Sequence, residues 1–501
     1  MGERDSLGVM ADQPHGTAMV LTGEVLKHGA GADGDVLVAF AIAVGVGDAA
    51  GPDRVDLGFR SDVEVAVVAF AEAPVDANPE VAAIEGEFSR ADTRDVVGTG
   101  GLGDVDDVHL RPDSQVARVQ STIHGMAAQD QVAIVGIGET DYSRESGRSE
   151  LTLALQAIMA ALDDAGIEPH EVDGLMRWAV DTSPEATVAS NLGVRDLAWF
   201  GDITQAGNVG AALVASASAA IRAGLAEVVV IYRGVNGRSG RRYGSGVVTG
   251  RRGQGSAAFS EPFGLLTPQH GLAMMAQRRM HETGVTSRQF GMVAVAERTH
   301  ANRNPRATFF DRPLTIEDHQ ESRLIVDPFR LYDCCLETDG GGALVLTSLE
   351  RARDLKQRPS VILAAAQHGY AAEREYTDTA AKFLAPRLWA QAGMGARDMD
   401  VAQIYDHFAP FVVFALEDYG FVERGEGGRF VESGGISWDG GTLPVNTSGG
   451  HLSEAYMQGM NQLIEGVRQV RGTSTSQVEN VGASFVDTGI GTGALILGPD
   501  A

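Results

Sequence analysis

Short apolar strands alternate with helices from residue 132 onward, and this alternation restricts the fold more than any other feature. VAIVGIG (132–138) predicts a buried strand. Residues 149–167 predict a helix with Ser149 as its N-cap, apolar residues three and four apart, and Gly166 at its end. Residues 207–224 predict a helix of small residues, apolar nearly all round, which belongs in the interior. Repeated alternation of this kind is typical of a layered α/β protein.

A second series of elements begins near Pro359 and follows the same layout as the first. In it, residues 401–408 predict a strand that ends in polar side chains, and residues 452–472 predict a helix. We therefore expect two similar αβ halves, residues 126–358 and 359–501.

Residues 1–125 have a different composition from the rest of the chain. They contain 22 Asp and Glu against 8 Lys and Arg, and they lack Tyr and Trp. Their apolar patches, such as VLVAFAIAVGVGDAAG, resemble strands but have no clear caps or helical period. Three interpretations stay open: an acidic accessory domain, a disordered acidic extension, or translated flanking sequence ahead of a natural start at Met126.

Charge and cysteine content narrow the possible partners and locations. The net charge of -27 argues against nucleic acid or an anionic membrane surface as the main partner. No apolar run is long enough for a transmembrane helix, and no secretory signal is evident. The two cysteines, Cys334 and Cys335, are adjacent, which disfavours a disulfide and favours a reducing cytoplasm. No metal-ligand spacing is found, so no metal site is predicted.

Four motifs together resemble the thiolase superfamily. They are QVAIVGIGETDYSRESGRSELTL, LYDCCLETDGGGALVLTS, YDHFAPFV and NTSGGHLSEAYMQGMN, the last followed by GVRQVRGTS. Within the superfamily the chain resembles the sterol-carrier-type lipid-transfer proteins, and most of all the steroid side-chain aldolases of actinobacteria. The resemblance implies an α/β thiolase fold with two similar αβ halves in an αβαβα arrangement. It also implies an active site between the halves and a homodimer across the N-terminal halves.

The nucleophilic cysteine of thiolases is missing from its expected place. The family carries it at the start of the buried central helix, where this chain has Gly207 followed by Asn208. By the resemblance these two residues line an oxyanion site at the helix N-terminus. Cys334 and Cys335 lie elsewhere, in the junction between the halves, where structural cysteines are the commoner case.

The family's Asn-Gly-Gly loop matches Asn446, Gly449 and Gly450, and the histidine that ends this loop in thiolases falls on Tyr456. The two glycines are expected to shape the loop and to offer N–H groups to an oxyanion. Tyr456 is predicted to transfer protons. The alternative is a tyrosine that packs under a helix.

A third catalytic motif of the family falls on residues 405–408, and the second catalytic cysteine falls near Asp487. Tyr405, Asp406 and His407 are predicted catalytic residues. His451 is a further residue expected to adjust the pKa values of the tyrosines. Alternatively, Tyr405 ends a strand and bonds a backbone carbonyl.

The Gly-rich stretch 233–260 contains six arginines and no acid until Glu261. Arg238, Arg241 and Arg242 are predicted to bind the phosphates of coenzyme A. A solvated cover loop is the alternative.

These features predict a carbon–carbon lyase that cleaves a β-hydroxyacyl-CoA by a retro-aldol reaction. By the resemblance, the substrate is a steroid side-chain CoA thioester, the products are a ketosteroid and propionyl-CoA, and a small OB-fold, zinc-ribbon protein is the partner. Coenzyme A enters as part of the substrate, and no permanently bound cofactor is expected. The alternatives are an acyl-CoA or lipid-binding protein without chemistry, and an acetyl-CoA acyltransferase.

Overall fold

A computed structural model of the chain describes residues 131–203, 209–240, 242, 257–369, 375–489 and 491–500, and the backbone of four strands near the N-terminus. The chain divides into two units, Met1–Pro112 and Asp113–Ala501.

The first unit contains a four-stranded antiparallel sheet in the order β1-β2-β3-β4. Its strands are β1 (Val9–Ala11), β2 (Thr17–Lys27), β3 (Val38–Asp48) and β4 (Val67–Ala69). β2 and β3 pair along their whole length. β3 and β4 lie within the apolar patches seen in the sequence.

The second unit is built on a nine-stranded mixed sheet in the order β13-β14-β15-β12-β5-β11-β8-β6-β7. One side of this order comes from the first predicted half and the other from the second. The two sides meet at β5 and β12, which pair through only Ile134–Ser360 and Ala133–Val361. The strands are β5 (Val132–Glu139), β6 (Gly174–Trp178), β7 (Trp199–Ile203), β8 (Val229–Asn236), β11 (Asp339–Ser348), β12 (Ser360–Gln367), β13 (Val401–Gln403), β14 (Ser484–Asp487) and β15 (Gly493–Pro499).

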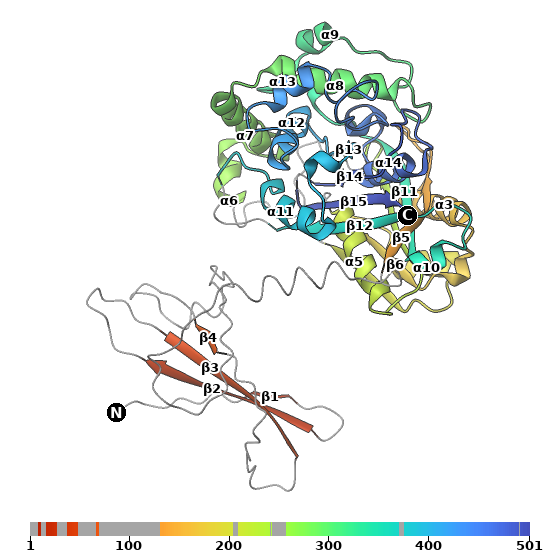
Figure 1. Cartoon of the computed structure of the whole chain (residues 1–501), viewed down its shortest axis with the longest axis vertical. Helices are drawn as coiled ribbons and strands as arrows, with labels where there is room; N and C mark the ends of the chain where they lie inside the picture. The colour runs from red at the N-terminus through yellow and green to blue at the C-terminus, as the bar shows by residue number, and fades with distance from the viewer. Residues whose placement is uncertain are drawn as a thin grey trace. The chain divides into compact units, whose positions relative to one another are not determined.

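Two helices fill the interior between the two sides of the sheet (Figure 1). α5 (Gly210–Arg222) contacts β6 and β11 of one half and β12 and β15 of the other, and α14 (Met460–Arg471) contacts β5 and β11 as well as β13–β15. α3 (Glu150–Ala165) covers the outer face of β5, β8 and β11, and α11 (Ala381–Ala392) packs against β12 and β15. The predicted αβαβα layering is therefore confirmed.

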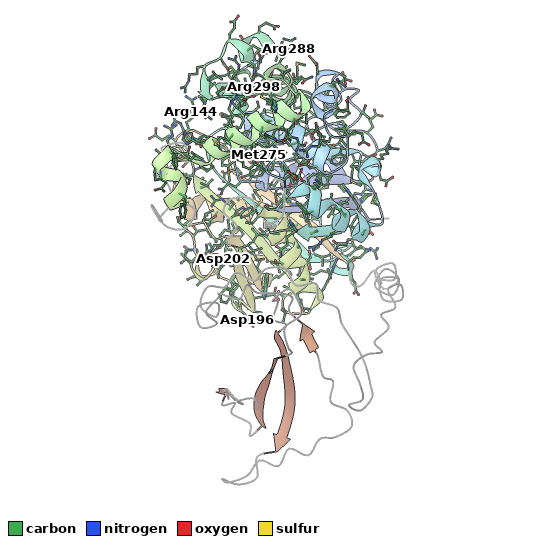
Figure 2. All side chains as sticks on the ribbon, turned by 90° about the vertical axis from the view of Figure 1, so that its left-hand side faces the viewer. Arg144, Asp196, Asp202, Met275, Arg288 and Arg298 are labelled. Atoms are coloured by element: carbon green, nitrogen blue, oxygen red, sulfur yellow. The ribbon has the colours of Figure 1, made fainter. Side chains whose placement is uncertain are left out.

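The second unit has further helices, several of them in an insertion between β8 and β11. The insertion carries α6 (Ala257–Ser260), α7 (Pro268–Thr283), α8 (Ser287–Ala301), α9 (Ile316–Glu321), β9 (Leu324–Val326) and β10 (Phe329–Arg330). The other helices are α4 (Glu185–Leu192), α10 (Leu349–Ala352), α12 (Ala409–Asp418) and α13 (Gly427–Glu432). In Figure 2 the insertion residues Arg288 and Arg298 lie toward one end of this unit, Met275 lies near its middle, and Asp202 of β7 lies toward the other end.

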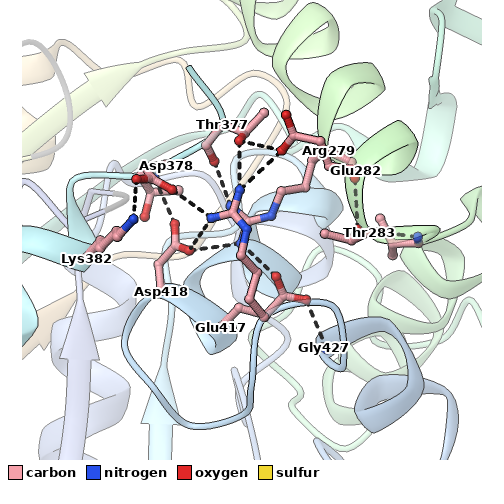
Figure 3. Close-up of polar contacts among 12 residues, drawn as sticks. Arg279, Glu282, Thr283, Thr377, Asp378, Lys382, Glu417, Asp418 and Gly427 are labelled. Carbon is pink, nitrogen blue, oxygen red and sulfur yellow. Dashed lines mark hydrogen bonds and ion pairs between the residues drawn. The ribbon is translucent and has the colours of Figure 1, made fainter. Parts of the chain in front are cut away.

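A buried ion-pair network ties the insertion to the C-terminal half (Figure 3). Arg279 of α7 donates to Glu417 at 2.7 Å and to Asp418 at 2.9 Å, both on α12, and to the carbonyl of Thr377 at 2.6 Å. Its guanidinium lies 4.8 Å from the ring centroid of Phe414. α8 also contacts α12 and α13, so the insertion is anchored where it approaches residues 405–408.

Two predicted elements near the candidate site are wrong in extent. The helix expected over 452–472 is broken: a π-helical turn covers Gly450–Glu454 and α14 begins at Met460. Gln458 and Gly459 have φ values of 53° and 92°, which no right-handed helix accommodates. The strand expected over 401–408 stops at Gln403. The caps predicted for α3, Ser149 and a left-handed Gly166, are confirmed.

Candidate active site

Tyr405 and Tyr456 form a hydrogen bond between their phenol oxygens, which lie 2.9 Å apart. Tyr405 is only 4% exposed, whereas Tyr456 is partly exposed. Tyr456 lies in the break between the π-helical turn and α14, where its N–H donates to Thr338 Oγ1 at 3.0 Å. The structure therefore joins two tyrosines that the sequence separates by 51 residues.

Asn446 explains why the strand before Tyr405 ends early. Its side-chain Oδ1 accepts the N–H of Ile404 at 2.8 Å, and its Nδ2 donates to the carbonyl of Ile404 at 2.9 Å. The amide thus replaces a neighbouring strand and lets the chain turn away from the sheet. Asn446 itself has a φ of 51°, a conformation that asparagine tolerates better than most residues.

The polar residues Asn-Thr-Ser of the loop each bind a different buried glutamate. These contacts are Asn446 Nδ2 to Glu297 Oε1 at 2.8 Å, Thr447 Oγ1 to Glu465 Oε1 at 2.6 Å, and Ser448 Oγ to Glu454 Oε2 at 2.6 Å. All six side chains are buried. The sequence analysis did not identify these glutamates, because they come from α8, from α14 and from the π-helical turn, and only the fold brings them to one loop.

Gly449 and Gly450 allow the loop to approach its surroundings closely. Both have positive φ, 110° and 57°. A Cβ at Gly449 would lie 2.6 Å from Ala301 Cβ, and one at Gly450 would lie 2.4 Å from Asp406 Oδ2. The N–H of Gly449 donates to the carbonyl of Asn446 at 2.9 Å, so this N–H group is bonded within the loop itself. The requirement for glycine here comes from packing and backbone angle.

Asp406 and His451 form a buried pair behind the tyrosines. His451 Nδ1 lies 3.2 Å from Asp406 Oδ1, and Nε2 accepts the N–H of Gly459 at 3.1 Å. An accepting Nε2 leaves the ring proton on Nδ1, facing the carboxylate. Burial on its own would raise the pKa of Asp406, but the contact with His451 and hydrogen bonds from His451 and Glu297 outweigh it and lower that pKa.

The His451 ring packs edge to face against both tyrosine rings, 4.7 Å from Tyr405 and 4.8 Å from Tyr456, while the two tyrosine rings lie 6.4 Å from each other. The His407 ring also packs against Tyr405, at 5.2 Å. Neither ring nitrogen of His407 has a hydrogen-bond partner within the described part of the chain. Burial, reinforced by His451, lowers the pKa of His407 to about 3, so this ring is neutral near pH 7. His407 therefore contributes a neutral imidazole to the site.

The N-termini of the two interior helices converge beside this cluster. Thr488 Oγ1 accepts the N–H of Ala211 in the first turn of α5 at 2.8 Å, and a Cβ at Gly459, which precedes α14, would lie 2.8 Å from Thr488 Cβ. Gly207 and Asn208, the predicted oxyanion residues, lie outside the described residues.

Asp487 ends β14 next to Thr488 and is fully buried. It accepts the Tyr419 hydroxyl at 3.1 Å and the N–H groups of Gly489 and Gly491. Burial raises its pKa to about 6 despite these bonds. The Asp487 carboxyl therefore anchors a tight loop.

The cysteines lie beside the site, but they are poorly suited to nucleophilic attack. The N–H of Cys335 donates to the carbonyl of His407 at 3.0 Å, and Leu336 donates in the same way to His451. Burial raises the pKa of Cys334 to about 12 and that of Cys335 well above its ordinary value. Since the thiolate is the nucleophile, neither thiol is activated.

Two of the three arginines that were predicted to bind coenzyme A form ion pairs with the same carboxylate. Arg242 Nε lies 2.6 Å from Glu337 Oε2, and Arg238 approaches the same oxygen at 3.9 Å. Arg241 lies outside the described residues. Arg233, counted with this basic stretch, is buried on β8 in an ion pair with Asp181 at 2.8 Å.

A cavity of about 660 Å³ is lined by residues 139–144, 305–309 and Arg312. None of the predicted site residues lines this cavity. Across the ranges that the structure describes, no cluster of three or more His, Cys, Asp or Glu side chains is arranged to hold a metal ion. In the same ranges, no helix has the length and apolar character needed to cross a bilayer.

Comparison with known proteins agrees with this geometry. Residues 364–495 match the family described as thiolase C-terminal domain-like. The chain is 48% identical over 385 residues to the 17-hydroxy-3-oxo-4-pregnene-20-carboxyl-CoA lyase of Mycobacterium tuberculosis, covering 74% of this chain and 99% of that protein. The chain belongs to the steroid side-chain aldolases of the thiolase superfamily.

Another aldolase of the family and one solved structure extend the match. The steroid side-chain-cleaving aldolase of Thermomonospora curvata is also 48% identical, over 74% of this chain and 98% of its own length. The solved structure of the "Ltp2-ChsH2(DUF35) aldolase" shares 46% identity, with a TM-score of 0.70, and covers 75% of this chain and 99% of that one. The predicted resemblance to this aldolase family is confirmed.

Proposed function

We propose that this protein is a retro-aldolase that cleaves the Cα–Cβ bond of a β-hydroxyacyl-CoA whose acyl part is a steroid side chain. The Tyr405–Tyr456 hydrogen bond carries the proposal, because it supplies two proton-transfer groups within 2.9 Å of each other. The products are a ketosteroid and propionyl-CoA. The family relatives support this choice, since their names describe the same type of reaction.

The reaction needs one proton removed and one added. A phenolate on one tyrosine takes the proton of the β-hydroxyl, the Cα–Cβ bond breaks, and its electron pair passes into the thioester as an enolate. The phenol of the other tyrosine then gives its proton to Cα. The α5 N-terminus, with Gly207 and Asn208, is proposed to stabilise the enolate oxygen.

The hydrogen bond between the tyrosines resets the site after each turnover. The tyrosine that took the hydroxyl proton is then a phenol, and its partner is a phenolate. Transfer of one proton across the 2.9 Å bond restores the starting state without exchange with solvent. A hydrogen bond from a phenol also stabilises a neighbouring phenolate.

The cysteines favour this lyase over an acyltransferase. An acyltransferase of the thiolase type needs a thiolate to hold the acyl group, and burial raises the pKa of both Cys334 and Cys335. The second candidate is a protein that binds acyl-CoA or lipid without chemistry.

The proposed assembly is a homodimer together with a small OB-fold, zinc-ribbon partner that binds the acyl-CoA. β7 is an edge strand of the sheet and Phe200 on it is 64% exposed, which supports a partner at the N-terminal half. The related Ltp2-ChsH2(DUF35) aldolase structure, whose name includes a DUF35 component, supports the second partner. Arg238, Arg241 and Arg242 are proposed to bind coenzyme A phosphates, and the two free cysteines fit a cytoplasmic location.

Product analysis tests the proposal. The full chain is incubated with a β-hydroxy steroid side-chain CoA thioester, with and without a zinc-ribbon partner, and the products are identified by mass spectrometry. We expect equal amounts of ketosteroid and propionyl-CoA. Binding of the thioester without cleavage under both conditions would favour the binding protein, and transfer of an acyl group to free CoA would favour the acyltransferase.

A further inference from the structure

Glu297, on α8, is a buried carboxyl that the proposed chemistry does not use. It is fully buried, and its Oε1 accepts Asn446 Nδ2 at 2.8 Å. Its Oε2 receives no hydrogen bond from any N–H or O–H group in the described part of the chain. A buried carboxyl oxygen without a donor calls for a physical explanation.

The neighbour of that oxygen is the Asp406 carboxyl. A Cβ placed on Gly450 would lie 3.0 Å from Glu297 Oε2 and 2.4 Å from Asp406 Oδ2, so both oxygens border the same glycine. Asp406 has its own donors: Leu452 N–H reaches Oδ2 at 2.9 Å, and Gln462 Nε2 reaches Oδ1 at 2.7 Å. No arginine or lysine of the described residues forms an ion pair with either carboxyl. Two adjacent buried carboxylates without a cation cannot both stay ionised.

We propose that Glu297 and Asp406 share one proton, held on Glu297 Oε2 and donated to Asp406 Oδ2, and that Glu297 positions the tyrosine pair through this bond. The proton satisfies the otherwise unpaired oxygen and keeps Asp406 a carboxylate. Asp406 then faces the Nδ1 proton of His451, and the other ring nitrogen is held by Gly459. The His451 ring, fixed in this way, packs edge to face against the rings of both Tyr405 and Tyr456 and orients them. Glu297 does not contact the tyrosines and is a positioning residue.

The electrostatic surroundings agree with a protonated Glu297. Burial, followed by the charge of Asp406 and a hydrogen bond with it, raises the pKa of Glu297 well above its ordinary value. Three other titratable groups interact electrostatically with Asp406, so that the pKa of one partner depends on the charge of the other. They are His451, His407 and Cys335. His407 is neutral near pH 7 and burial keeps Cys335 a thiol.

Stability as a function of pH tests the pair without any assay of activity. The folded protein retains a proton on Glu297 that the unfolded chain releases near pH 4.3, so this residue favours folding less and less as the pH rises above that value. Glu297→Gln can donate to Asp406 permanently and keeps an oxygen for Asn446. We expect the Tm of Glu297→Gln relative to wild type to rise between pH 5 and pH 8. A constant difference over this range would overturn the proposal.

Infrared difference spectroscopy in D₂O identifies which residue holds the proton. The wild-type minus Glu297→Gln difference spectrum at pH 7 should contain the carbonyl band of one protonated carboxyl, because the Glu454 carboxyl, whose pKa burial raises to about 8, contributes to both spectra and cancels. Absence of that band from this difference spectrum, together with its presence in the wild-type minus Asp406→Asn difference spectrum, would place the proton on Asp406 and overturn the assignment.

The kinetic test rests on the proposed function and separates positioning from general stability. Glu297→Ala should lower kcat by about tenfold or more with little change in KM, and Glu297→Gln should restore kcat to within about threefold of wild type. Equal losses in both variants would contradict the positioning role. A wild-type enzyme without lyase activity would instead refute the proposed function, while the pH and infrared results would still decide the carboxyl pair.

Discussion

Replacing Gly450 with alanine should damage both stability and turnover, because the new methyl group would occupy space that Asp406 needs. The Cβ would lie 2.4 Å from Asp406 Oδ2, whereas ordinary van der Waals contact begins at 3.4 Å, so the carboxylate must move by about 1 Å. A shift of that size disturbs the 3.2 Å contact between Asp406 and His451 Nδ1. The His451 ring, which packs against both tyrosines, would then lose its fixed orientation.

The expected loss of stability has two parts. Gly450 has a φ of 57°, and an alanine in this left-handed region costs about 1–2 kcal/mol. Overpacking against Asp406 and Glu297 adds about 1–3 kcal/mol. Gly147 is a matched control, because it has a φ of 65° and a Cβ added there would meet no atom within 4 Å. Gly147→Ala should therefore lose only the unfolding free energy that comes from placing an alanine in the left-handed region.

Urea unfolding of both variants, with kcat measured on the same samples, tests this reasoning. Gly450→Ala should lose more unfolding free energy than Gly147→Ala, and its kcat should fall by about 10²-fold. Equal losses of stability in the two variants, with kcat unchanged in Gly450→Ala, would show that Asp406 does not need its present position.

Three further predictions follow from the sequence and the site. A protein that begins at Met126 and lacks residues 1–125 should fold and form a dimer, as measured by thermal melting and size-exclusion chromatography; aggregation would contradict this. Cys334→Ala and Cys335→Ala should keep near-normal turnover, with a stability loss of about 1–2 kcal/mol, and an acyl-thioester on either cysteine in the mass spectrum would contradict the lyase. The lowered pKa of His407, about 3, means that the unfolded chain binds a proton near pH 6.5 that the folded protein does not. His407→Phe should therefore gain Tm relative to wild type as the pH falls from 7 to 5, and a constant difference would contradict this.

The sequence was sufficient to predict the layers of the fold because local signals agree with one another there. The Ser149 cap, the Gly166 end and the small-residue interior helix all follow from patterns within about 20 residues. The motifs likewise pointed to Tyr405 and Tyr456 as one site, and the structure joins them by a hydrogen bond.

The structural features that the sequence did not predict depend on contacts between segments that are far apart along the chain. The early end of β13 follows from the Asn446 side chain, which replaces a strand neighbour 42 residues away. The break before α14 follows from Gly459, whose N–H is bound by His451. Glu297 resembles any polar residue on a helix until the fold buries it beside Asp406. Local periodicity carries no information about such contacts.

Turnover of the single variants Tyr405→Phe and Tyr456→Phe tests the central claim most directly. Each change removes one phenol oxygen from the 2.9 Å pair. Tyr232→Phe is the matched control, because it removes a buried hydroxyl that bonds the carbonyl of Ser183 at 2.7 Å, away from the pair. With a β-hydroxy steroid side-chain CoA thioester, we predict a fall in turnover of about 10²-fold or more in both site variants, unchanged binding of the thioester, and near-normal turnover in the control. Wild-type turnover in both Tyr405→Phe and Tyr456→Phe would contradict the account and reduce the two tyrosines to packing residues.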